Sequence, residues 1–209
     1  MKYTKKQYIQ YLAGIILTPM GVVLTINSHA GAGGYDALNF AIAVKLGINT
    51  SLAIYMTAFL AVLITAGVRR GYPRLTTFIS SFLLGLSTDV WNVVLRRIEG
   101  DTIVSSVIIL LLGMVLVASG IAVYMHSGLP TNPTDDMIVA FKEKGIAIGT
   151  AKVCFDIICV VLAFILGGQI GWGTIIITLG LGWLIQWFYA VFGRIFSADK
   201  VNEHQEKRA

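Results

Sequence analysis

Charged side chains are scarce in this sequence. Only 13% of the 209 residues are Asp, Glu, Lys or Arg, whereas a soluble globular domain carries about 25%. Hydrophobic residues make up 56% of the chain, and the mean hydropathy is +0.77. This composition excludes an ordinary soluble domain and predicts an integral membrane protein surrounded by a lipid bilayer.

Cysteines and the sequence motifs of enzymes are also scarce. The two cysteines, Cys154 and Cys159, are five residues apart, which on a helix turns them about 140° from each other. The chain has no P-loop, no Gly-x-Ser-x-Gly and no HExxH motif. We therefore expect no enzyme activity, no cofactor and no metal site. The net charge of +5 lies in short clusters between apolar runs, which does not indicate nucleic-acid binding.

Long apolar runs dominate what is present. A helix needs about 20 predominantly apolar residues to cross a bilayer. The first run is too long for the core of a signal peptide, so we interpret it as a retained helix. Six runs qualify as membrane spans, near residues 8–28, 50–68, 75–95, 102–125, 150–167 and 173–193.

Lysine and arginine predict the orientation. With six spans and residues 1–7 in the cytoplasm, all but three of the sixteen Lys and Arg residues lie inside, and the polar tail 196–209 is cytoplasmic too. An alternative with eight crossings, in which the short segments 35–46 and 135–144 also span, gives the same count. We prefer six because about ten helical residues are too short to cross a bilayer.

The two halves of the chain, residues 8–98 and 99–195, resemble each other. Three spans is an odd number, so the second half would enter the membrane upside down, as in the inverted repeats of many secondary transporters. The predicted fold class is an all-α membrane protein of six transmembrane helices, arranged as two inverted three-helix repeats. Shifts of 99 and then 97 residues match Gly14 with Gly113, Gly21 with Gly120, Asp36 with Asp135, Gly85 with Gly182, and Asp89 with Gln186.

Each half has an unusual segment after its first span. These segments read "GAGGYDALNFAIAVKLG" and "GLPTNPTDDMIVAFKEKG". Both open with turn-forming residues and then place an Asp, Asp36 or Asp135, where its carboxylate can cap free helical amides. We expect each to form a short helix that is re-entrant or lies at the membrane interface.

The motifs of both halves resemble those of a known family. "GAGGYDAL" and "TNPTDDMI", "INTSLAIY" and "IGTAKVCF", and "TTFISSFLLGLSTD" and "GWGTIIITLGLGWLIQ" are similar to segments of the YczE/YitT group of bacterial integral membrane proteins. The resemblance covers about residues 8–195. It implies a multi-pass protein of the bacterial inner membrane with both termini in the cytoplasm, and it implies no substrate.

The first candidate for a functional residue is Asp89, which the pattern places inside the third span. A charged residue within a span is costly, and such residues often mark a substrate or proton pathway. Asn92 follows on the same helical face, and Gln186 is the counterpart of Asp89 in the second half. The alternative is a structural contact in which Asp89 and Gln186 join the two halves.

The two short segments supply the other main candidates. Asp36, Asp135 and Asn132 are expected either to cap helices or to bind a cation or an amine, while free amides at the same helix starts favour an anion. The second-line candidates are His29 and His126 at the membrane edges, Lys152 and Asp156 as an i,i+4 ion pair, and Trp183.

These observations favour a secondary transporter of an unidentified small solute. Its central cavity would lie among the two short segments and the third and sixth spans. One alternative is an accessory membrane protein that holds a soluble enzyme complex, with "RRGYPR" and "FKEKG" as contact segments. Another is the substrate-binding subunit of an ATP-driven uptake complex. A homodimer or a cytoplasmic protein partner is compatible with each reading.

Overall fold

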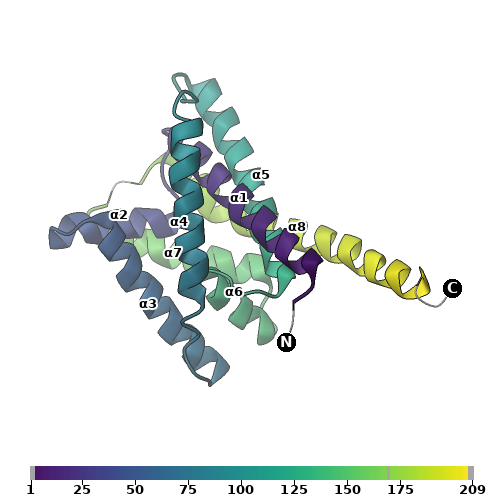
Figure 1. Ribbon diagram of the computed structural model, residues 1–209. Helices are drawn as coiled ribbons and strands as arrows, with labels where there is room; N and C mark the ends of the chain where they lie inside the picture. Colours follow the sequence, from purple (N-terminus) through teal and green to yellow (C-terminus); the bar gives the residue numbers. More distant parts are fainter. Residues whose placement is uncertain (1–2, 169, 207–209) are drawn as a thin grey trace.

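The protein is helical throughout the part that the structure describes. The computed structural model describes residues 3–168 and 170–206, and these residues form α-helices joined by short loops, with no strand among them (Figure 1). The helices are α1 (Lys5–Asn27), α2 (Gly34–Leu46), α3 (Thr50–Arg69), α4 (Thr77–Val94), α5 (Ile103–Ser127), α6 (Pro133–Glu143), α7 (Ile148–Ile165) and α8 (Trp172–Glu206).

Six of these helices are long and apolar enough to cross a membrane. They are α1, α3, α4, α5, α7 and the Trp172–Phe196 part of α8. Each matches one of the six predicted spans to within a few residues, so the predicted number of membrane-length helices is confirmed. One boundary differs, because α8 continues as a helix to Glu206 through much of the segment that was predicted to be a polar tail.

The two short helices, α2 and α6, form where the sequence predicts them. Asn132 caps the start of α6, because its side-chain oxygen accepts a hydrogen bond from the backbone amide of Asp135. Pro133 occupies the first turn of the helix. Helix α2 begins at Gly33 without a side-chain cap and ends at Gly47, which has a left-handed φ of 65°. The prediction that the Asp carboxylates cap these helices is therefore wrong for both. In α6 the side-chain oxygen of Asn132 is the cap, and in α2 no side chain caps the helix start.

Helices α1 and α5 pack tightly and run antiparallel. A Cβ atom built on Gly14 would lie 2.6 Å from the carbonyl oxygen of Gly120, and one on Gly21 would lie 2.6 Å from that of Gly113. The small residues let the two backbones approach closely, which is how membrane helices associate. Gly14 therefore contacts the counterpart of Gly21, and Gly21 contacts the counterpart of Gly14.

The remaining helix contacts also occur in matched pairs. Helix α4 packs on α1 as α8 packs on α5, α2 packs on α7 as α6 packs on α3, and α2 contacts α8 as α6 contacts α4. One helix contact has no counterpart in the other half. Helix α7 packs along α8, whereas α3 and α4, both fully described, do not pack on each other and diverge from their connecting turn (Figure 1).

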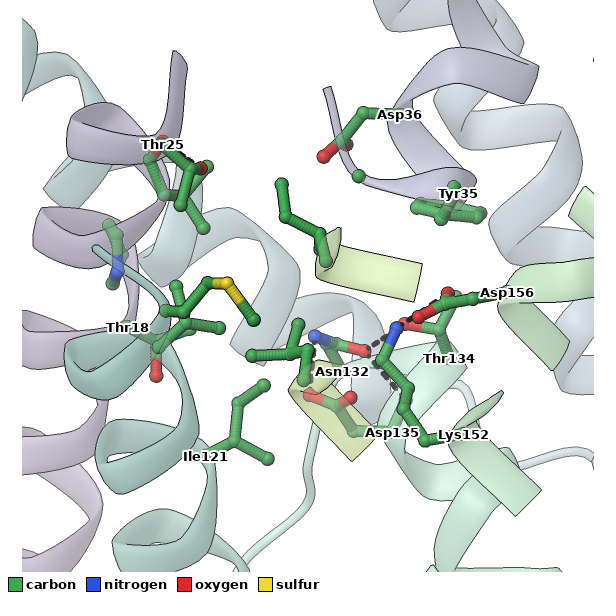
Figure 2. Close-up of a pocket in the computed structure, with 18 of the residues that line it drawn as sticks. Thr18, Thr25, Tyr35, Asp36, Ile121, Asn132, Thr134, Asp135, Lys152 and Asp156 are labelled. Carbon is green, nitrogen blue, oxygen red and sulfur yellow. Dashed lines mark hydrogen bonds and ion pairs between the residues drawn. The ribbon is translucent and has the colours of Figure 1, made fainter. Parts of the chain in front are cut away.

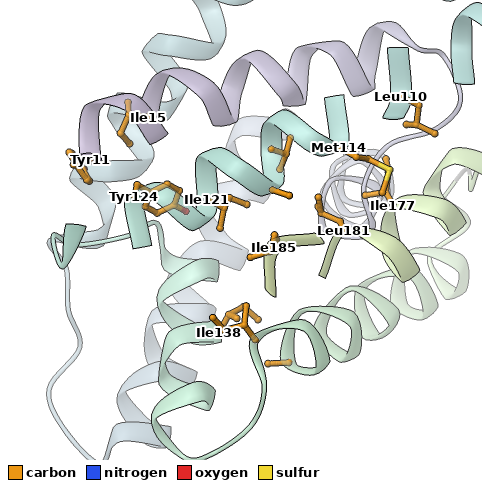
Figure 3. Close-up of a cluster of buried hydrophobic side chains, with 14 of the residues drawn as sticks. Tyr11, Ile15, Leu110, Met114, Ile121, Tyr124, Ile138, Ile177, Leu181 and Ile185 are labelled. Atoms are coloured by element: carbon orange, nitrogen blue, oxygen red, sulfur yellow. The ribbon is translucent and has the colours of Figure 1, made fainter. Parts of the chain in front are cut away.

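A hydrophobic core joins the two halves at the centre of the molecule. It combines residues of α1, α5, α6, α7 and α8, and Figure 3 shows α5 passing between the side chains of α1 and α8. The fully buried members include Leu110 and Tyr124 of α5, Ile138 of α6 and Ile185 of α8. This core fixes the helices that surround the central cavity.

Candidate functional site

A cavity of about 220 Å³ lies where the two halves meet. Every helix except α3 contributes to its lining among the described residues. The starts of α2 and α6 enter it from the two halves, as Figure 2 shows. The prediction that the short segments and the third and sixth spans surround a cavity therefore agrees with the lining, to which α1, α5 and α7 also contribute.

An ion pair lies in the middle of α7 on the cavity wall. The Lys152 ammonium is 2.7 Å from Oδ1 of Asp156, and the two side chains are 13% and 1% exposed. The other carboxylate oxygen of Asp156, Oδ2, is buried with no hydrogen-bond partner among the described residues. The i,i+4 pair that the sequence predicts thus forms, on the part of α7 that lines the cavity.

Asp36 and Asp135 bring two more carboxyl groups to the cavity. Burial raises the pKa of Asp36 to about 6 and that of Asp135 to about 7, because desolvation disfavours the charged form. The Lys152 ammonium opposes this shift for both groups, and the Asp156 carboxylate adds to it. The four ionisable groups therefore interact electrostatically as one cluster.

The two Asp residues differ in their hydrogen bonds. Asp135 accepts a bond of 2.8 Å from the side-chain amide of Asn132, whose own oxygen accepts from Thr134 at 2.8 Å. The Asp36 side chain has no hydrogen-bond or ion-pair partner among the described residues and points into the cavity in Figure 2. Asp36 is therefore the carboxyl group with the most freedom to meet a ligand.

Asp89 and Asn92 lie outside the cavity. Both are exposed on α4, which instead lines the cavity through Leu84 and Thr88. The structural contact suggested between Asp89 and Gln186 is not formed, because α4 and α8 do not pack on each other. Gln186 instead accepts a hydrogen bond of 2.9 Å from the backbone amide of Gly149 at the start of α7.

The second-line candidates apart from Lys152 and Asp156 also lie elsewhere. His29 is exposed in the loop after α1 and borders a separate pocket beside α2. His126 stacks on the ring of Tyr189, with 4.0 Å between the ring centroids, and its Nε2 is 2.8 Å from the Tyr189 carbonyl oxygen. Trp183 is 54% exposed on the outer face of α8. None of these three lines the central cavity.

Sequence reasoning missed several cavity residues on the spans. Thr18 and Thr25 of α1 and Thr88 of α4 line the cavity, and the Thr18 hydroxyl is buried without a partner among the described residues. Tyr35, next to Asp36, is held by a 2.9 Å hydrogen bond to Thr57 of α3. A threonine beside a proline at mid-span, as in Thr18-Pro19, was the signal that could have revealed the α1 contribution.

Six membrane-length helices around a polar cavity define the chain as a multi-pass integral membrane protein. The chain belongs to a family of unknown function, DUF6198, whose model matches residues 5–190. It is 28% identical over 178 residues to the uncharacterized membrane protein YczE of Bacillus subtilis (strain 168), which covers 84% of this chain and 82% of that protein.

Two further relatives also match most of the chain. The uncharacterized protein YyaS of Bacillus subtilis (strain 168) is 27% identical over 192 residues, or 91% of this chain and 96% of that protein. An uncharacterized protein of Haemophilus influenzae is 22% identical over 188 residues, or 88% of this chain and 84% of that protein. No solved structure matches the chain. The resemblance to the YczE group that the sequence motifs indicated is confirmed.

Proposed function

We propose that the protein is a secondary transporter that moves a small solute through the central cavity. The observation that carries the proposal is the position of four ionisable groups in one cavity among membrane-length helices. Ionisable groups inside a membrane are costly, and they usually mark a pathway for a solute or a proton. In this proposal the chain lies in the bacterial inner membrane with both termini in the cytoplasm.

The contacts within the molecule support two inverted repeats. The antiparallel course of α1 and α5, with Gly14 on Gly120 and Gly21 on Gly113, is the packing expected around a two-fold axis in the membrane plane. The matched pairs of helix contacts support the same axis. Short helices that meet near a central site are the usual binding elements of such transporters.

The unmatched contact supports two alternating conformations. Helix α7 packs on α8 so closely that a Cβ atom on Gly182 would lie 2.7 Å from the carbonyl oxygen of Gly149. Its counterpart in the first half, Gly85 of α4, has no atom within 4 Å of such a Cβ. The hairpin of α7 and α8 is therefore closed and the hairpin of α3 and α4 is open, although their sequences correspond.

In the second conformation the two hairpins exchange these arrangements. Helix α4 packs along α3, Gly85 occupies the place that Gly182 has in the closed hairpin, and α7 separates from α8. Asp89 then accepts a hydrogen bond at the start of α3, as its counterpart Gln186 now does at the start of α7. A carboxylate is favourable there because the start of a helix is electropositive. This role accounts for a charged residue that is exposed in the present conformation.

Cysteine labelling tests the arrangement without knowledge of the solute. In a Cys154→Ala, Cys159→Ala background, single cysteines at Gly33 and at Asn132 are treated with an impermeant thiol reagent from each side of the membrane. We expect Gly33→Cys to be labelled from the outside and Asn132→Cys from the cytoplasm. Labelling of both cysteines from one and the same side only would contradict alternating access.

The scaffold alternative has less support. One of its contact segments, "RRGYPR", begins with Arg69, whose guanidinium is 2.6 Å from Asp136 and 2.8 Å from Glu143 of the protein's own α6. The residues at this end of α3 and α6 are thus engaged with each other. A cytoplasmic partner would have to bind around this internal ion-pair cluster.

A further inference from the structure

The central cavity has two unlike walls. On one side, the starts of α2 and α6 and the middle of α7 present three carboxyl groups and one ammonium group, those of Asp36, Asp135, Asp156 and Lys152. On the other side, α5 and α8 present only hydrocarbon and thioether groups, those of Met114, Val117, Ile121, Ile177 and Leu181. Figure 2 shows Asp36 across the space from Ile121, with Asp135 drawn nearer to Ile121.

The acidic wall carries more negative than positive charge, because three carboxyl groups share it with one ammonium group. Lys152 donates to Asp156 Oδ1, while Asp156 Oδ2 is buried and has no partner among the described residues. Asp36 has no side-chain partner there either. A buried carboxylate without a partner is strongly unfavourable, and breaking off one member of a buried ion pair is costly. A cation with several N–H donors would satisfy these oxygens, whereas an anion would add to their repulsion.

The apolar wall and the volume limit the rest of the ligand. A cavity of about 150 Å³ lined by aliphatic and aromatic side chains holds a benzene molecule. The 220 Å³ here therefore admits a ligand of roughly ten non-hydrogen atoms. Such a ligand would place its charged end on the carboxyl groups and a hydrocarbon part against Val117, Ile121 and Leu181.

We infer that the cavity binds a small amphipathic organic cation, an ammonium or guanidinium group attached to a compact hydrocarbon. The inference rests on the proposed transport function in so far as this cation is the solute that is moved. Asp36 is the principal ligand to the cation, and Asp156 and Asp135 are the neighbouring carboxyl groups of the site. Lys152 holds Asp156 in place and keeps the empty cavity from carrying three uncompensated carboxylates.

Three isosteric compounds test the charge preference in the unmodified protein. Phenylguanidinium, neutral phenylurea and anionic phenylacetate are nearly equal in size, and their binding to the protein in lipid nanodiscs can be measured by calorimetry. We expect phenylguanidinium to bind at least about tenfold more tightly than phenylurea, and phenylacetate to bind least. Equal binding of all three, tighter binding of phenylacetate, or no binding of any would overturn the cation inference.

Variants then locate the site. Asp36→Asn removes one charge from a side chain that makes no hydrogen bond, and it should weaken phenylguanidinium binding roughly tenfold while leaving phenylurea unchanged. Asp101→Asn makes the same change at an exposed position outside the cavity and should alter neither. Leu181→Phe places a larger side chain on the apolar wall and narrows the cavity, so it should weaken the binding of both phenylguanidinium and phenylurea. A loss of phenylguanidinium binding in Asp101→Asn equal to that in Asp36→Asn would contradict the assignment.

Counterflow separates this inference from the proposed function. Proteoliposomes loaded with unlabelled phenylguanidinium are placed in labelled phenylguanidinium, and the uptake of protein-free liposomes is subtracted. Uptake that Asp36→Asn reduces would support both the site and its transport. Tight binding without counterflow would keep the cation site and contradict transport. Selective binding of phenylacetate with the predicted two-sided cysteine labelling would contradict only the cation inference.

Discussion

The side-chain oxygen of Gln186 accepts a hydrogen bond from the backbone amide of Gly149, at 2.9 Å, and so ties α8 to the start of α7. The corresponding residue of the first half, Asp89, is exposed on α4 and makes no such contact with α3. The residue at this position thus makes a hydrogen bond across the hairpin of α7 and α8, and its counterpart makes none across the hairpin of α3 and α4. This difference supports the proposal that the protein has a second conformation.

Asp89 should matter only for the second conformation. Asp89→Leu removes the acceptor for the start of α3, and because a hydrogen bond to a charged group contributes about 1.5–3 kcal/mol, the population of that conformation should fall about tenfold or more. Asp89→Gln keeps an acceptor, as in Gln186, and should retain most of the population. The readout is the rate at which Asn132→Cys is labelled from the cytoplasm.

Gln186→Leu serves as the opposing control for that prediction. It removes the acceptor from the closed hairpin, so it should favour the second conformation and speed the same labelling reaction. If Asp89→Leu and Gln186→Leu change the rate in the same direction, or if Asp89→Leu and Asp89→Gln behave alike, the assigned role of Asp89 is wrong.

The α1–α5 contact should be sensitive to a single methyl group. A Cβ atom at Gly21 would lie 2.5 Å from the backbone nitrogen of Val117, and backbone atoms cannot move aside as a flexible side chain can. Gly21→Ala should therefore destabilise the protein by about 1–3 kcal/mol. Gly67→Ala, on α3 with no atom within 4 Å of its Cβ, should be neutral or slightly stabilising. Thermal unfolding in detergent measures both, and equal losses would contradict the packing described.

Cation binding should strengthen as the pH rises. Burial raises the pKa of Asp36 to about 6 and that of Asp135 to about 7, with Lys152 opposing and Asp156 adding to both shifts. The carboxylate of Asp136, the next residue along α6, also raises the pKa of Asp135. Both carboxyl groups lose their protons as the pH increases through these values, and only the charged forms attract a cation.

The expected gain in phenylguanidinium affinity is about tenfold between roughly pH 5 and pH 8. Calorimetry at a series of pH values measures it, with phenylurea as the compound whose binding should not change. Asp36→Asn should flatten the lower part of the curve. An affinity that falls with rising pH would show that the ligand binds to the protonated carboxyl groups.

The spans and the short helices could be predicted because local sequence determines them. Apolar length identifies a span, and the pattern Asn132-Pro133 with an Asp in the next turn identifies the start of α6. The glycines that match between the halves are also the ones that meet in the α1–α5 contact, although the sequence predicts no contact between them. Each of the predicted features depends on composition and spacing, and no long-range information is needed to read them.

The cavity lining could be predicted only in part. Asp36, Asp135 and Asn132 lie at helix starts that the sequence marks, and all three line the cavity. Asp89 was ranked first because it is charged within a span, yet the face of α4 toward the cavity is set by how α4 packs on α1, and that face carries Thr88 instead. The central place of Lys152 and Asp156 follows from the crossing of α2 over α7, where a Cβ atom on Gly34 would meet the backbone of Asp156.

Gly85→Trp tests the central claim of alternating conformations most directly. Gly85 has open space in this structure, so the indole fits here and would block the packing of α4 on α3. Leu86→Trp is the matched control, because its counterpart in the closed hairpin is Trp183, which is 54% exposed. We expect Gly85→Trp to abolish labelling of Asn132→Cys from the cytoplasm and to retain labelling of Gly33→Cys from the outside, while Leu86→Trp preserves both. Undiminished cytoplasmic labelling in Gly85→Trp would contradict alternating access in this protein.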